Sequence, residues 1–103
     1  MDGHEVVLET GLAYTEGEPV RVMLRRRGRR YELRDRGRAL ELAGAPAGWH
    51  ECAAAVVGAH DLNVNRAGVV FVPAVEGGVD RDWLAGRVAE TSPALYDALL
   101  ELA

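Results

Sequence analysis

The segment from Val22 to Gly37 reads VMLRRRGRRYELRDRG and carries seven arginines. A guanidinium group binds carboxylates and phosphates through paired hydrogen bonds and stacks on flat rings. A ribbon of arginines therefore has the chemistry to contact either an acidic protein surface or the phosphates of a nucleic acid. The candidate binding residues are Arg25, Arg26, Arg27, Arg29, Arg30 and Arg34.

The same arginines also fit the solvent face of a half-buried sheet. Arg21, Arg25 and Arg34 alternate with apolar residues, and charged faces of this kind protect a hairpin from edge-to-edge aggregation. Acidic residues elsewhere in the chain could pair with them across the sheet, among them Glu5, Glu9 and Glu18. The pattern favours a solvated face, and among binding functions it favours contact with an acidic surface.

Cys52 and His60 form a second candidate pair. They are eight residues apart in a segment of helical spacing, which places them within about 80° of each other around the helix axis. Such a pair could act as a nucleophile with its base, or as half of a zinc site. A structural zinc site needs about four ligands, and the remaining histidines, His4 and His50, do not complete one. We therefore expect no metal, no cofactor and no enzymatic activity, with Cys52 as a small buried side chain.

A third candidate is the acidic and amide series Asp61, Asn63 and Asn65. These residues match the first three ligand positions of a calcium-binding EF-hand loop. The match then fails, because Arg66 stands at the position of the required glycine and Val72 at that of the bidentate glutamate. Alternation of polar and apolar residues in a strand explains the spacing, so we predict no calcium site.

Composition limits the remaining possibilities. The chain has 103 residues with a formal net charge of −4, which predicts one domain spanning residues 1–103. It contains no lysine, which excludes Schiff-base chemistry and a phosphate-binding P-loop. Usage rich in arginine, alanine and glycine is typical of a high-GC bacterial genome.

The same composition indicates a location. The longest apolar runs, CAAAVVGA and VVFVPAV, are far shorter than the roughly 18–20 residues of a membrane helix, and the amino-terminal residues lack the pattern of a secretory signal. One cysteine excludes an internal disulfide. We predict a cytoplasmic protein that does not insert into membranes.

Periodicity predicts an α+β fold with about five mainly antiparallel strands and three or four helices. The expected strands are 5–10, continuing towards residue 14, then 20–25 and 30–34 joined at Gly28, and a second hairpin within 62–75 in which Pro73 marks an edge or an end. The expected helices are a short one that Asp35 caps and that ends near Gly44, a second at 48–60, a third at 80–90 and a fourth that begins with Ser92 as N-cap.

The turn Asp35-Arg36-Gly37, at the end of one strand and the start of a helix, carries a family resemblance. Together with the order of elements around it, the turn resembles a family of small bacterial and phage domains in which a D-x-G turn opens a helix. The resemblance implies the fold over most of the chain. That family has no settled activity, so it implies no catalytic or binding residues.

Charge is segregated along the chain, and this segregation leads to the functional expectation. Residues 21–38 hold nine arginines against two acids, whereas the rest holds three arginines against fourteen acids. We expect an interaction or regulatory module that contacts an acidic protein partner through the arginine hairpin, or that self-associates through a helical face. The alternative is a nucleic-acid-binding protein that uses the same hairpin, although the acidic remainder of the chain would repel phosphate.

Overall fold

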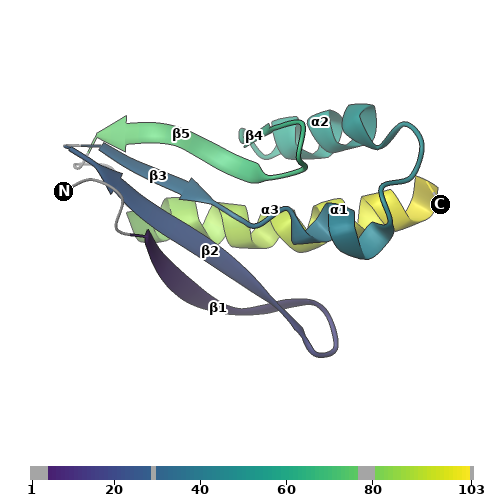
Figure 1. Ribbon diagram of the computed structural model, residues 1–103, viewed down its shortest axis with the longest axis horizontal. Coiled ribbons are helices and arrows are strands. Elements are labelled where there is room, and N and C mark those ends of the chain that lie inside the picture. The colour runs from purple at the N-terminus through teal and green to yellow at the C-terminus, as the bar shows by residue number, and fades with distance from the viewer. Residues whose placement is uncertain (1–4, 29, 77–80, 103) are drawn as a thin grey trace.

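A long helix lies along one face of a five-stranded antiparallel sheet in the computed structural model of the chain (Figure 1). The structure describes residues 5–28, 30–76 and 81–102. The elements are β1 (Glu5–Thr15), β2 (Glu18–Arg27), β3 (Arg30–Arg34), α1 (Arg38–Ala43), α2 (Trp49–Ala59), β4 (Asn63–Val64), β5 (Val70–Glu76) and α3 (Arg81–Leu102). The strand order is β1-β2-β3-β5-β4. The predicted α+β class is therefore confirmed.

The alternation of β2 and β3 directs their apolar side chains towards α3. Val22 and Leu33 are fully buried on this inner face, whereas Arg21 on the opposite face is exposed. The two strands pair as predicted, with Leu24 opposite Leu33, and Gly28 near the tip has a φ of 62°. Such positive φ values are easily adopted by glycine, which explains the residue at the tip.

Strand β1 forms one edge of the sheet. It extends to Thr15, beyond the predicted strand at residues 5–10 and its expected continuation towards residue 14. Its register against β2 shifts between Glu9 and Ala13, where Gly11 has a φ of 74°. The hydroxyl of Thr10 donates a hydrogen bond to the Val20 carbonyl at 2.7 Å and accepts one from the Leu12 amide. These bonds satisfy backbone groups that the irregular register leaves without a partner strand.

Strand β5 lies between β3 and β4, not at the outer edge of the sheet. Strand β4 pairs only with Val70 and Phe71, so from Val72 onwards β5 has β3 alone as its described neighbour. The β3 register also shifts at this point, between Tyr31 and Leu33. Proline has no backbone N–H to donate to a neighbouring strand. Pro73 is tolerated in β5 because β4 does not extend alongside this residue. The prediction that Pro73 ends the strand is wrong, since the strand continues to Glu76.

The two predicted carboxy-terminal helices are one helix. α3 runs without interruption through Pro93, so Ser92 is not an N-cap. The hydroxyls of Thr91 and Ser92 lie 2.7 and 2.9 Å from the carbonyl oxygens four residues earlier. The helix continues because Leu95 and Leu99, both fully buried, extend its apolar face into the core and offset the bond that proline cannot make.

The start of α1 also differs from the prediction. The N-cap is Gly37, with a φ of 70°, and not Asp35. Asp35 lies two residues before the cap and is 1% exposed, with its side chain turned into the protein. The predicted end is correct, because Gly44 is the C-cap.

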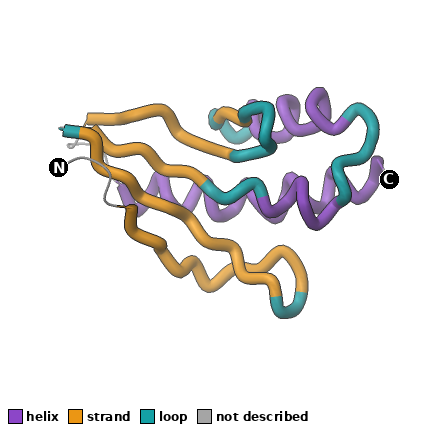
Figure 2. The backbone as a smooth tube through the Cα atoms, in the orientation of Figure 1, coloured by secondary structure: helices purple, strands orange, loops and turns teal. Residues whose placement is uncertain are grey.

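Helices α1 and α2 pack against α3, and Figure 2 shows both of them beside the carboxy-terminal half of α3. The largest apolar side chains with no exposed surface lie at the contact of sheet and helices: Leu33, Leu95, Leu99, Val20, Val22, Val57, Val70 and Val88. Among the helices that the structure describes, none has the length and hydropathy to cross a bilayer.

Candidate functional site

The outer face of the sheet carries the predicted arginines beside carboxylates of the same sheet. Arg34 bonds to both carboxyl oxygens of Glu5, at 3.0 and 3.1 Å, and Arg21 lies 3.4 Å from Glu9. Arg25 stands in register between Glu5 on β1 and Glu32 on β3. On this face three arginines are balanced by three glutamates, as expected for a solvated sheet face.

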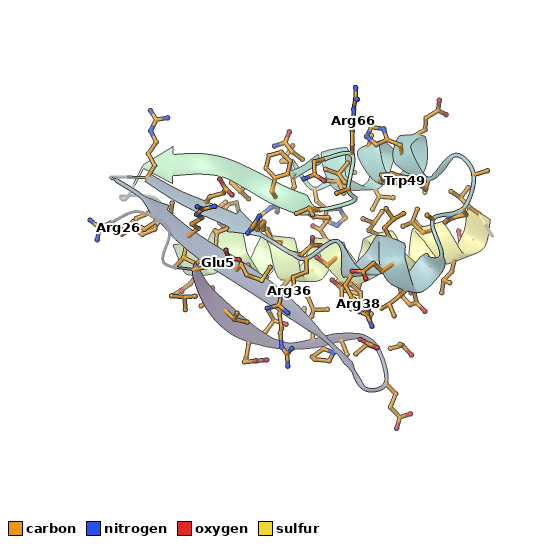
Figure 3. The ribbon with its side chains drawn as sticks, in the orientation of Figure 1. Glu5, Arg26, Arg36, Arg38, Trp49 and Arg66 are labelled. Carbon is orange, nitrogen blue, oxygen red and sulfur yellow. The ribbon has the colours of Figure 1, made fainter. Side chains whose placement is uncertain are left out.

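The tip of the hairpin holds two more of the predicted arginines. Arg26 and Arg30 are exposed, and the Arg26 Nε donates a 3.0 Å hydrogen bond to the Gly28 carbonyl. Figure 3 shows Arg26 at the end of the molecule where the hairpin closes. Arg29, and the side chain of Arg27, lie outside the described residues. The four predicted side chains that the structure describes therefore divide into a charge-balanced face, with Arg25 and Arg34, and an exposed tip, with Arg26 and Arg30.

The helical face predicted as a surface for self-association lies mainly in the protein core. Leu84, Val88, Leu95 and Leu99 are buried within the chain, so these side chains are not available to a second molecule. Trp83 differs, because 58% of it is exposed and the Arg87 guanidinium lies 5.2 Å from its ring centre.

A groove lies between the edge strand β1 and helix α3. Its volume is about 470 Å³, and its floor consists of Leu8 with the small side chains of Ala85 and Ala89. The remaining lining residues are Glu9, Thr10, Leu12, Asp82, Gly86 and Glu90. The α3 residues recur at intervals of three and four, which places them on one helix face. Small residues on that face leave the space that forms the groove.

One wall of the groove is the edge strand β1. Among the strands that the structure describes, β1 pairs with β2 alone, so its other side carries backbone N–H and C=O groups without a partner strand. Val6 and Leu12 of β1 are 52% and 40% exposed. A second hollow of about 440 Å³ shares Glu9 and Leu12 with the groove, so the recessed surface continues along the strand.

The rim of the groove is acidic. Glu9, Asp82 and Glu90 are all exposed, and the lining residues that the structure describes include no basic one. Glu9 has a neighbouring cation in Arg21, but both side chains are largely exposed, so their attraction is weak. The groove therefore combines an apolar floor, a free strand edge and negative potential.

A buried polar cluster around Asp35 lies elsewhere, between the sheet and α3. Its Oδ1 accepts hydrogen bonds from the amides of Gly37 and Val70, each at 2.9 Å. Its Oδ2 lies 2.7 Å from the Ser92 hydroxyl. Burial raises the pKa of Asp35 above its ordinary value, although the hydrogen bonds from Ser92, Gly37 and Val70 oppose that shift. This cluster holds β3, β5 and α3 together.

Tyr14 lies next to that cluster and is 8% exposed. Its ring meets Tyr96 of α3 edge to face, with 6.1 Å between ring centres. Burial raises the pKa of the Tyr14 phenol, and the nearby charge of Asp35 raises it further. The Tyr14 phenol therefore stays uncharged near neutral pH, and its ring separates the polar cluster from the protein surface.

A small cationic pocket lies on the outer side of Tyr14. It has a volume of about 100 Å³ and is lined by Tyr14, Glu18, Pro19, Arg21, Arg36 and Arg38. The Arg38 guanidinium bonds to both Glu18 oxygens, at 2.9 and 3.3 Å, and this contact raises the pKa of Arg38. Arg36 is exposed and has no hydrogen bond or ion pair with another described residue.

The other candidates from the sequence lie in and after α2 and at the β4–β5 turn. The His60 ring Nδ1 donates to the Val56 carbonyl at 2.9 Å at the end of α2, and Cys52 is a half-buried free thiol. The Asn65 side chain accepts hydrogen bonds from the amides of Ala67 and Val69 and so shapes the β4–β5 turn. Within 5–28, 30–76 and 81–102, no three histidine, cysteine or acidic residues gather as metal ligands would.

Sequence reasoning missed the groove and the small cationic pocket. The groove had a weak signal, namely the small residues Ala85, Gly86 and Ala89 between the acids Asp82 and Glu90. The sequence places Arg36 and Arg38 in the basic segment, but Tyr14 is far from them along the chain, so their common pocket could not be predicted.

Comparisons of the chain with protein-family models, with curated proteins and with solved structures find no match. The resemblance of the Asp35-Arg36-Gly37 turn to a domain family therefore stays a prediction.

Proposed function

We propose that the protein is a non-enzymatic interaction module that binds an extended, basic segment of another protein in the groove between β1 and α3. This proposal rests on three features of one groove of about 470 Å³. The groove has an apolar floor and an acidic rim, and one of its walls is the edge of β1, which no other described strand pairs with besides β2. An extended chain can add to a free strand edge through backbone hydrogen bonds, while alternate side chains enter neighbouring pockets.

The floor of the groove sets the size of the side chains that fit. Ala85 and Ala89 are 9% and 3% exposed, so the space above them is bounded by methyl groups and the Leu8 side chain. Apolar side chains of a bound segment would lose contact with water against these groups. Because the backbone hydrogen bonds come from β1, the segment must be extended and not helical.

Charge selects the composition of the segment. Glu9, Asp82 and Glu90 attract arginine or lysine, and they repel an acidic strand. A second copy of this chain is a poor partner through β1, since its own β1 contains no basic residue to complement the acidic rim. The occupant is therefore a basic segment of a different protein.

The arginine hairpin is less suited to be the main contact. Its outer face is balanced by Glu5, Glu9 and Glu32, so net positive charge is confined to the tip. Contact with an acidic partner through the tip, and nucleic-acid binding by the tip, both stay predictions.

A fluorescent ten-residue peptide in which arginine alternates with valine tests the proposal, beside the same peptide with glutamate in place of arginine. Gly86→Trp is designed to fill the groove from α3, where a Cβ at position 86 would meet no atom within 4 Å. Gly58→Trp is the matched control, because Gly58 is an exposed glycine of α2 with the same free space. Fluorescence anisotropy measures the dissociation constants.

We expect saturable binding of the basic peptide that Gly86→Trp weakens by about tenfold or more and Gly58→Trp leaves unchanged. The glutamate peptide should not bind. Equal affinity of the two tryptophan variants would refute the groove as the site. Binding of duplex DNA that weakens steeply with salt, and that disappears when Arg26 and Arg30 become serine, would instead support the nucleic-acid alternative.

A further inference from the structure

The small pocket beside Tyr14 carries a second, independent inference. Arg21 comes from β2, whereas Arg36 and Arg38 come from the connection between β3 and α1, and all three line one hollow. β3 ends at Arg34, which pairs with Met23 of β2. On the side of β2 that faces away from β1, the residues before Met23 therefore lie next to the β3–α1 connection and not next to a strand. The fold thus brings three guanidinium groups together at the place where the sheet opens.

Two of the three guanidinium groups are already held in position. Arg38 is fixed by its paired contacts with Glu18, and Arg21 lies 3.4 Å from Glu9. Arg36 has no such partner among the described residues and is exposed. Glu18 is the one acid among the described lining residues, and Glu9 and Glu41 contact Arg21 and Arg38 from outside the lining.

We propose that this pocket binds a phosphoryl group, either as free phosphate or as the phosphate of a small monoester. A volume of about 100 Å³ suits a group of the size of phosphate. Arg36 is the guanidinium of the lining that no described acid contacts, so it attracts a dianion more strongly than a single carboxylate. Guanidinium groups bind phosphate oxygens in paired geometry, and Arg36 supplies donors that no described residue of the chain uses.

The floor of the pocket supports this assignment. Tyr14 is 8% exposed and Pro19 has no N–H, so the floor offers an apolar surface beside the cations. Charge-assisted hydrogen bonds are stronger where one side of the site excludes water. Figure 3 shows Arg36 and Arg38 on the side of β1 and β2, and Arg66 on the opposite side of the molecule.

The test uses the full chain labelled with ¹⁵N and titrated with inorganic phosphate at about pH 8, where phosphate is mainly a dianion, at constant ionic strength. Arg36→Ser removes the free guanidinium from an exposed position, so the fold should be kept. Arg66→Ser is the matched control, because Arg66 is an exposed arginine in the β4–β5 turn. Sodium acetate at the same ionic strength tests a single negative charge.

We expect saturable amide shifts around residues 14, 18–21 and 36–38, with affinity about tenfold or more lower in Arg36→Ser and unchanged in Arg66→Ser. Acetate should give no saturation. Non-saturable shifts, or equal loss in both serine variants, would show that the pocket has no specific affinity for phosphate and would overturn the proposal.

Glycerol 3-phosphate distinguishes the two sources of the phosphoryl group. Affinity equal to or higher than that of inorganic phosphate assigns a monoester, and affinity at least about tenfold lower assigns the free ion. The peptide groove does not share these arginines, so failure of this test leaves the proposed interaction function unaffected.

Discussion

The Oδ2 atom of Asp35 lies 2.7 Å from the hydroxyl oxygen of Ser92, a residue 57 positions later in the chain. The Asp35 Oδ1 accepts the amides of Gly37 and Val70, so one carboxyl group joins the start of α1, the start of β5 and the middle of α3.

Removal of the Asp35 side chain should strongly destabilise the protein. Asp35→Ala leaves two buried amides and a hydroxyl without this partner, and we expect a loss of about 3 kcal/mol in the free energy of unfolding. Asp35→Asn should cost much less, because its carbonyl oxygen can accept both amides and its NH₂ can donate to Ser92. Urea unfolding of both variants measures the difference. Equal losses would contradict the hydrogen-bond account.

Stability should fall as pH rises through the titration of Asp35. Burial raises the pKa of Asp35 above the ordinary 3.8 that applies to the unfolded chain, so the folded state holds its proton to higher pH. The resulting stabilisation is complete below pH 3.8 and is lost as pH rises through the folded-state pKa. Urea midpoints across this range should decline in the wild type, and Asp35→Asn should lack that component.

Two glycine-to-alanine changes should have opposite signs. Gly68 has a φ of 80°, and a Cβ there would lie 2.8 Å from the Leu40 Cβ, so Gly68→Ala should cost about 2 kcal/mol or more. Gly86 is inside α3 with free space around it, so Gly86→Ala should add up to about 1 kcal/mol through helix propensity. Thermal unfolding measures both. A stabilising Gly68→Ala would refute the close packing of the β4–β5 turn on α1.

The charge pairs of the outer sheet face should matter little for stability. Glu5→Gln removes the carboxylate that Arg34 contacts at 3.0 Å, where about a third of each side chain is exposed. Solvent screens such pairs, so we expect a loss of less than about 1 kcal/mol that diminishes with added salt. Urea unfolding at low and high salt provides the measurement. A much larger, salt-independent loss would indicate that Arg34 depends on Glu5 for its burial.

Much of the sheet could be predicted because its charges alternate with its apolar residues. Val22, Leu24 and Leu33 identify one face of the hairpin, and Gly28 identifies its turn. The single helix α3 could not be predicted this way, because Ser92 followed by Pro93 is also the pattern of a helix start. Burial of Leu95 and Leu99 against the sheet, a tertiary effect, decides in favour of continuity.

The sites were harder to predict than the strands. Asp35 before a helix has the usual character of a cap, and its true partners, Val70 and Ser92, are distant in sequence. The groove exists because α3 has small side chains at Ala85 and Gly86. Small residues in a helix form no sequence motif, so the groove could not be recognised from them. The arginine segment was conspicuous in the sequence, yet three of its members are balanced by carboxylates that only the strand register brings near.

The Asp35 contacts also constrain the order of events during folding. Their partners are separated by 35 and 57 residues, so the cluster cannot form until both the second hairpin and the last helix have reached the sheet. Contacts of such sequence separation impose a high loop-closure entropy and slow the search for the native state. The carboxyl group therefore closes the structure late, and the amides of Gly37 and Val70 should exchange with solvent hydrogen only when the whole molecule opens.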